Sequence, residues 1–268
     1  MTTSQRTIAF GDDHSPGAGI AWQWCIHQQW AGWRVRVLTA AGRPEVAGED
    51  HSCHPWQPPS PRTAPAECGL APVLHETAAA DPRALLGTGS PGDLIVVGGR
   101  GRGLLKALHV GSTAEWLMRC PNAPLVIARQ PERVTRVILC TDGSRHADSA
   151  LGTLLLLPWL ASCHVTVLQA VEGPRRHGDS ARAAADALAA VGCTVEVVVL
   201  EPDPTYLTHN VRTMLETEIA ARSPDLVALG TAGLGGRKRL QLGSVASDVA
   251  HHTTHTVLLS RAPEPAAE

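Results

Sequence analysis

Two glycine-rich motifs are the part of this 268-residue sequence whose residue types and spacing can do chemistry. Each motif reads G-x2-G-x9-G-S and begins at the end of an apolar run. Glycines let a backbone turn sharply and approach an anion, and the N-terminus of a helix favours negative charge. The pattern therefore predicts phosphate binding at both motifs. Their residues are Gly98, Gly101, Gly111 and Ser112 in the first copy and Gly230, Gly233, Gly243 and Ser244 in the second.

The two motifs belong to an internal repeat. The apolar runs DLIVVG (93–98) and DLVALG (225–230) lie 132 residues apart, as do the two Gly-Ser pairs. Farther upstream, IAFGDD around Asp12 matches VILCTDGS around Asp142 at an offset of 130. Near-constant offsets over separated blocks indicate a duplicated domain.

We place the boundary in the QPER stretch and expect domains at residues 1–131 and 132–268. The link is short, so the two halves should pack closely.

The elements that must position the motifs alternate between strand and helix. In the second half, buried-strand patterns alternate with segments of helical periodicity, which predicts a parallel sheet with helices on both faces. The expected strands are 136–140, 164–171, 194–200, 225–230 and 255–261, and the expected helices are 146–160, 179–191, 205–222 and a short one from Ser244.

The first half follows the same order except at residues 43–69. Prolines at 44, 55, 58, 59, 61 and 65 make a regular helix implausible there. We expect an irregular excursion, either a plain surface loop or a lid or partner surface. Its histidines and cysteines match no established zinc-finger spacing, so no metal site is predicted.

Composition sets limits on partners and location. The net charge of −2 gives no general attraction to nucleic acid or to an anionic membrane. No run approaches the roughly 20 apolar residues that cross a bilayer, and the N-terminus shows no signal-peptide pattern. Seven cysteines without a C-x-x-C pair suit reduced, buried thiols. The default expectation is a cytoplasmic protein.

The sequence resembles the universal stress protein family. That family has a first strand ending in Asp, often as D-G-S, and G-x2-G-x9-G-[ST] after its fourth strand. Asp142-Gly143-Ser144 matches fully, whereas Asp12 is followed by Asp13-His14-Ser15. The resemblance implies two tandem Rossmann-like, adenine-nucleotide-alpha-hydrolase-like domains. Each would have a five-stranded parallel sheet of order 3-2-1-4-5, with nucleotide at the switch between the first and fourth strands.

The resemblance also implies roles for individual residues. Asp12 and Asp142 would lie beside the nucleoside, and backbone near Ala40 and Ala170 would read the adenine edge. The glycine loops would hold ribose and phosphates. The ligand would be ATP, ADP or AMP, with Mg²⁺ near the phosphates in a hydrolytic variant. Because Asp13 adds a second carboxylate beside Asp12, we expect tighter binding in the second half.

Three functions remain open from the sequence. The first is a nucleotide-binding regulator of stress response or dormancy that acts on an unidentified protein partner. The second is a slow ATPase or nucleotidyl-transfer enzyme on the same scaffold. No P-loop, nucleophile elbow or histidine base at motif spacing is present, so no catalytic residue is assigned. The third is a nucleotide-free interaction module in which the glycines only make a strand-to-helix turn.

The last strand of each half suggests how the halves assemble. Residues 124–129 and 255–261 would lie at sheet edges, and exposed apolar edges favour pairing. We expect the halves to pair there as an intramolecular pseudo-dimer, and a homodimer is a further option. Trp22, Trp30 and Trp33 should pack in the core or the interface, and His251, His252 and His255 should lie at an interface or on the surface.

Overall fold

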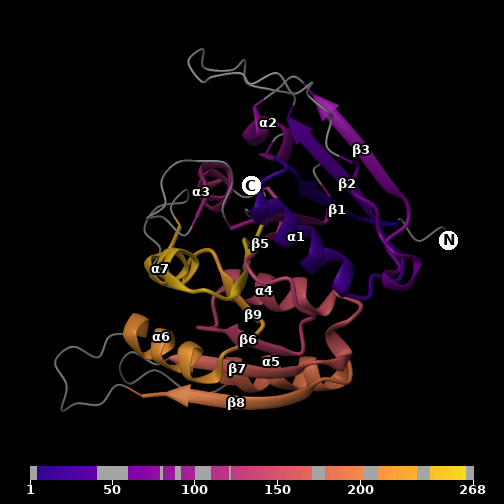
Figure 1. Cartoon of the computed structure of the whole chain (residues 1–268). Coiled ribbons are helices and arrows are strands. Elements are labelled where there is room, and N and C mark those ends of the chain that lie inside the picture. The colour runs from indigo at the N-terminus through magenta and orange to yellow at the C-terminus, as the bar shows by residue number, and fades with distance from the viewer. Residues whose placement is uncertain are drawn as a thin grey trace, which may run out of the picture.

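The computed structural model describes residues 5–40, 60–78, 81–87, 92–99, 110–120, 122–170, 179–201, 211–233 and 242–263. Strands and helices alternate along most of the described chain, as expected for an α/β protein (Figure 1). In the first half the elements are β1 (Arg6–Gly11), α1 (Pro16–His27), β2 (Trp33–Ala40), β3 (Val73–Ala78), α2 (Pro82–Gly87), β4 (Leu94–Gly98), α3 (Ser112–Arg119) and β5 (Leu125–Ala128).

Among the described residues, the second half repeats this order with one more helix. Its elements are β6 (Arg136–Cys140), α4 (Arg145–Leu155), β7 (His164–Ala170), α5 (Asp179–Ala190), β8 (Thr194–Leu200), α6 (Val211–Arg222), β9 (Leu226–Gly230), α7 (Ser244–His252) and β10 (Thr256–Ser260). The five expected strands are confirmed to within a residue at each end. The expected helix 205–222 is present from residue 211, and its first part lies outside the described residues.

The ten strands of the described residues form one sheet, of order β3-β2-β1-β4-β5-β10-β9-β6-β7-β8. Each half therefore has the predicted order 3-2-1-4-5, and every strand pair within a half is parallel. The halves join where β5 and β10 pair antiparallel, with Val126 opposite Leu258. This is the pairing expected between the last strands, and it leaves β3 and β8 at the two outer edges of the sheet (Figure 1).

Two apolar cores cover the two faces of the sheet. Alternate residues of each strand enter opposite cores, so that Ile8 and Phe10 join one and Ala9 joins the other. The first core takes side chains from α1, α4 and α5, and the second takes them from α2, α3, α6 and α7. Because each core contains residues of both halves, the halves pack closely, as the short link predicted.

The first half has no α-helix between β2 and β3 among its described residues, where the second half has α5. A 3-10 turn, Ala66–Cys68, is present instead, in agreement with the irregular excursion expected from the prolines. The part of that excursion at 43–59 lies outside the described residues. Large aromatic side chains help fill the first core here: Trp22, Trp30 and Trp33 are all at most 3% exposed. The expectation that these tryptophans pack in the core is confirmed.

Candidate functional site

The turns after β1 and β6 end at two helix N-caps. The hydroxyl of Ser15 accepts a hydrogen bond from the Ala18 N–H at 3.1 Å, and that of Ser144 accepts one from the Ala147 N–H at 3.2 Å. These caps satisfy backbone donors that the first turn of a helix leaves open. The two serines are therefore equivalent. They lie 129 residues apart, whereas the sequence-based pairing of Asp12 with Asp142 uses an offset of 130.

Equivalence of the serines corrects the alignment of the two acidic motifs. The Ser15 N–H donates to Asp13 Oδ1 at 3.0 Å, just as the Ser144 N–H donates to Asp142 Oδ1 at 2.9 Å. The structural counterpart of Asp142 is thus Asp13, and the sequence-based pairing of Asp142 with Asp12 is shifted by one residue. Alignment of the two sequence motifs pairs the wrong acids because Asp12 and Asp13 are adjacent.

The residues on either side of these acids agree with the corrected alignment. His14 has a φ of 56° and Gly143 a φ of 73°, so both occupy the left-handed region that glycine adopts most readily. The His14 N–H donates to Asp12 Oδ1 at 2.9 Å, whereas the Gly143 N–H donates to Thr141 Oγ1 at 3.3 Å. Asp12 therefore replaces an uncharged threonine, and the first half reads D-D-H-S where the second reads T-D-G-S.

The first glycine of each phosphate motif lets a helix approach its strand. A Cβ on Gly98 would lie 2.5 Å from the Gly17 carbonyl carbon, and a Cβ on Gly230 would lie 2.5 Å from that of His146. Both glycines end the fourth strand of their half and contact the first turn of α1 or α4. Their lack of a side chain is thus required by helix–strand packing at the carboxyl end of the sheet.

The later glycines of the second motif line the turn into α7. A Cβ on Gly233 would lie 2.5 Å from Asp142 Oδ2, so this backbone passes directly beside the carboxylate. The Gly243 N–H donates to the Thr231 carbonyl at 2.7 Å, which brings the end of the loop back to the end of β9. Ser244 is then the first residue of α7. The structure thus brings Asp142, Gly233, Gly243 and Ser244 together.

The first motif has the same closure. The Gly111 N–H donates to the Gly99 carbonyl at 2.9 Å, and Ser112 opens α3. Gly101 lies outside the described residues, as do the basic residues in the two nine-residue spacers.

Ala40 and Ala170 are the last residues of β2 and β7. The turns after β1 and β6 are bonded to these strands, because Asp12 N donates to Leu38 O and Thr141 N donates to Leu168 O, at 3.0 and 2.9 Å.

An ion pair that the sequence did not predict holds Asp12. Arg62 donates from Nε to Oδ2 at 2.8 Å and from Nη2 to Oδ1 at 3.0 Å, and only 3% of Asp12 is exposed. Burial by itself raises the pKa of Asp12, but the bonds from Arg62 and from the His14 amide outweigh it and hold this pKa below its usual value. Arg62 belongs to the excursion, 50 residues along the chain, so local sequence gave no signal for the contact.

The halves also meet beside the two phosphate-motif helices. His251 Nε2 of α7 lies 2.6 Å from Glu115 Oε2 of α3, which places His251 at an interface as expected. Arg129 donates to the carbonyls of Ala250 and His255 and so caps the C-terminal end of α7. The two helices that begin at the candidate sites are therefore joined to each other.

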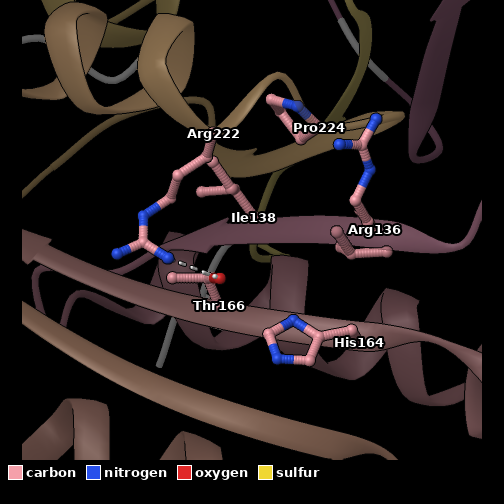
Figure 2. A pocket seen from close by; sticks show the side chains of 7 residues that line it. Arg136, Ile138, His164, Thr166, Arg222 and Pro224 are labelled. Carbon is pink, nitrogen blue, oxygen red and sulfur yellow. Dashed lines mark hydrogen bonds between the residues drawn. The ribbon is translucent and has the colours of Figure 1, made fainter.

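A separate pocket of about 180 Å³ lies away from these turns (Figure 2). Its lining includes Arg136 and His164, the first residues of β6 and β7, so it lies at the amino ends of the strands. Arg222 points into it beside Thr166, but its guanidinium is already paired with Glu196 at 2.6 Å and with Glu218 at 2.5 Å. Ligands of open α/β sheets bind at the opposite ends of the strands. We therefore place the candidate site at the carboxyl ends.

Residues 133–261 match the model described as the Universal stress protein family. These residues form a universal stress protein domain. It contains β6 to β10, the D-G-S turn and the complete second glycine motif. No significantly similar sequence was found among curated proteins.

Two solved structures share the fold over almost all of the chain. A universal stress protein from Archaeoglobus fulgidus DSM 4304 superposes with a TM-score of 0.66 at 15% identity, covering 97% of this chain and 100% of that one. A putative universal stress protein from Pseudomonas aeruginosa UCBPP-PA14 gives a TM-score of 0.59 at 15% identity, covering 96% and 94%. Within the described residues, no helix combines the length and apolar character needed to span a membrane.

Proposed function

We propose that this chain is an adenine-nucleotide-binding universal stress protein with a regulatory role in stress response or dormancy. The observation that carries the proposal is the arrangement at the carboxyl end of the second half. There the Asp142 carboxylate lies against the backbone of Gly233, and the loop closes through the Gly243–Thr231 bond at the start of α7. A carboxylate beside glycine backbone and a helix N-terminus provides acceptors for ribose hydroxyls and donors for phosphates.

The proposed contacts follow from that arrangement. Asp142 would bind the nucleoside, backbone near Ala170 would read the adenine edge, and Gly233, Gly243 and Ser244 would hold ribose and phosphates. The first half has Asp13, Ala40, Gly111 and Ser112 at the equivalent positions of the fold. The ligand would be ATP, ADP or AMP, with Mg²⁺ held between the phosphates and the carboxylate in the triphosphate form.

We further propose that the domains 1–131 and 132–268 act as an intramolecular pseudo-dimer joined at β5 and β10. Nucleotide occupancy would alter the surface around α3 and α7, whose N-termini belong to the phosphate motifs. Such a change would be read by a protein partner in the cytoplasm. The Glu115–His251 contact links these two helices, Arg129 joins the end of β5 to α7, and both contacts support this arrangement.

Mass analysis of small molecules released from the purified, denatured full-length chain tests the proposal. We expect an adenine nucleotide in the released fraction, and calorimetric binding of ATP or AMP to the emptied protein with or without Mg²⁺. An Asp142→Ala variant should lose that binding while it remains folded. Absence of released nucleotide together with no heat and no thermal shift would refute the proposal. Phosphate release under multiple turnover, measured alongside, would instead favour the enzymatic alternative.

A further inference from the structure

Residues 60–70 lie over the face of the sheet that α1 covers, and three hydrogen bonds fix them there. The Arg62 carbonyl accepts from His75 Nε2 at 2.9 Å, and the Thr63 carbonyl accepts from Trp22 Nε1 at 3.1 Å. The Cys68 carbonyl accepts from the Trp30 N–H at 2.7 Å. Because His75 is on β3 and Trp22 is on α1, the segment runs between the sheet edge and the first helix.

The side chain of Arg62 extends from this segment to the carboxyl end of β1. Its guanidinium and the backbone N–H of His14 donate to both oxygens of Asp12, and His14 Nδ1 lies 3.4 Å from Oδ2. The Asp12 side chain is 1% exposed and that of Arg62 is 21% exposed. A buried carboxylate that loses its partner is strongly unfavourable. The ion pair therefore holds Arg62 at the end of β1.

The described part of the second half is built differently at the same place. Thr141 replaces Asp12, and its hydroxyl satisfies the Gly143 N–H without any charge. The helix α5 replaces the irregular segment, and its Ser180 side chain lies 3.2 Å from where a Cβ on Gly143 would be. The buried carboxylate of Asp12 and the arginine that neutralises it therefore occur together in the first half, and the arginine is supplied by the irregular segment.

We infer that Arg62 occupies, from within the chain, the place at the end of β1 that a nucleoside would need. The first half then excludes nucleotide, and the chain binds a single adenine nucleotide, in its second half. This inference rests on the proposed function of the fold. It makes Arg62 the residue that determines which of two similar sites is used.

The position of the ion pair is the physical reason. Asp12 N donates to Leu38 O, so the guanidinium lies where β1 and β2 end, two residues before Ala40. Ligands of open α/β sheets lie just outside these strand ends, at the switch point beside β1. A nucleotide entering there would displace Arg62 and leave a buried carboxylate unpaired close to the phosphates. Repulsion between these anions would oppose binding.

The experiment is a stoichiometry measurement on the full chain by equilibrium dialysis with ATP and with AMP, each with and without Mg²⁺. The wild-type chain should bind one nucleotide, and Gly243→Val should bind none. Gly111→Val, which alters only the first motif, should keep one nucleotide at unchanged affinity. The double variant Asp12→Thr/Arg62→Ala recreates the uncharged pattern of Thr141, leaves no unpaired charge, and should bind two.

Arg36→Ala is the matched control, because it breaks another arginine–carboxylate pair of the first half, Arg36 with Glu76 at 2.6 Å, and should leave the stoichiometry at one. Two nucleotides on the wild-type chain would overturn the inference and leave the proposed function intact. A folded double variant that still binds only one, or a Gly111→Val chain that loses its nucleotide, would also overturn it. No binding by the wild type would instead refute the proposed function itself.

Discussion

Trp30 and Trp159 meet edge to face across the boundary between the two halves, with their ring centroids 6.1 Å apart and an interplanar angle of 89°. They lie 129 residues apart, the same offset as the two N-cap serines, so they are equivalent residues of the repeat. Trp24 adds a second contact to Trp159, at 6.2 Å. The repeat therefore packs against itself through its own equivalent positions, and one apolar core extends through both halves.

The first prediction concerns this contact. Trp159→Ala should lower the free energy of unfolding by about 3–5 kcal/mol, because it opens a cavity in a core that both halves share. A double-mutant cycle with Trp30→Ala should give a coupling energy of about 0.5–1.5 kcal/mol in urea unfolding. Trp159→Phe serves as the control and should cost less. Two separate unfolding transitions, with only one shifted by Trp159→Ala, would contradict the shared core.

A second prediction distinguishes a glycine that close backbone packing requires from one that has space for a side chain. Gly230→Ala should destabilise the protein by about 1–3 kcal/mol, because the new Cβ would lie 2.5 Å from the His146 carbonyl carbon and α4 would have to shift. Gly152→Ala, inside α4 with no atom within 4 Å of the added Cβ, should stabilise it by about 0.4–1 kcal/mol. Thermal unfolding measures both. Equal shifts of the two variants would show that α4 does not depend on close contact with β9.

The sequence predicts the strands, the repeat and the turns of the second half, because apolar periodicity and glycine spacing are local properties, whereas the strand order is predicted by the family resemblance. It fails at Asp12, where two adjacent acids make the sequence alignment ambiguous and the hydrogen bond from the Ser15 N–H to Asp13 resolves it. It also fails at Arg62, whose partner is distant along the chain and whose neighbours are prolines without periodicity. Contacts of this kind depend on how an irregular segment crosses the sheet, which no local pattern encodes.

The third prediction is that the Asp12–Arg62 pair stabilises the protein in a pH-dependent way. The folded pKa of Asp12 is lowered, so its contribution is fully present above the unfolded pKa of about 3.9 and is lost as the pH falls through the folded pKa. Arg62→Ala should cost about 3 kcal/mol at neutral pH. Asp12→Thr/Arg62→Ala should recover most of that loss and weaken the decline of stability below pH 4. Urea unfolding between pH 3 and 7 measures this, and a loss in Arg62→Ala that persists unchanged at pH 3 would disagree with an ionic origin.

The fourth prediction concerns the contact between α3 and α7. Burial raises the pKa of Glu115, but bonds from Arg119 and His251 outweigh it and the pKa is lowered. The stabilisation is therefore present above the usual glutamate pKa and is lost as the pH falls below it. Glu115→Gln should cost about 1 kcal/mol at pH 6 and little at pH 3. Glu76→Gln, which removes the more exposed Arg36–Glu76 pair at β3, is the control and should change stability less.

The last prediction compares the two phosphate motifs directly. A Cβ at Gly243 would lie 3.2 Å from the Ala232 Cα and 3.4 Å from the Thr231 carbonyl oxygen, so a β-branched side chain there meets backbone that cannot move without opening the loop. The same side chain would project at the N-terminus of α7, where phosphate oxygens would approach the backbone N–H groups. Gly243→Val should therefore lower the affinity for ATP at least 100-fold in calorimetry. Gly111→Val makes the equivalent change at α3, but in a half whose β1 end already holds Arg62, and should change the affinity less than twofold. Circular dichroism and thermal unfolding establish that both variants fold. The opposite result, with Gly111→Val abolishing binding and Gly243→Val leaving it intact, would place the nucleotide in the first half and show that Arg62 moves aside for it.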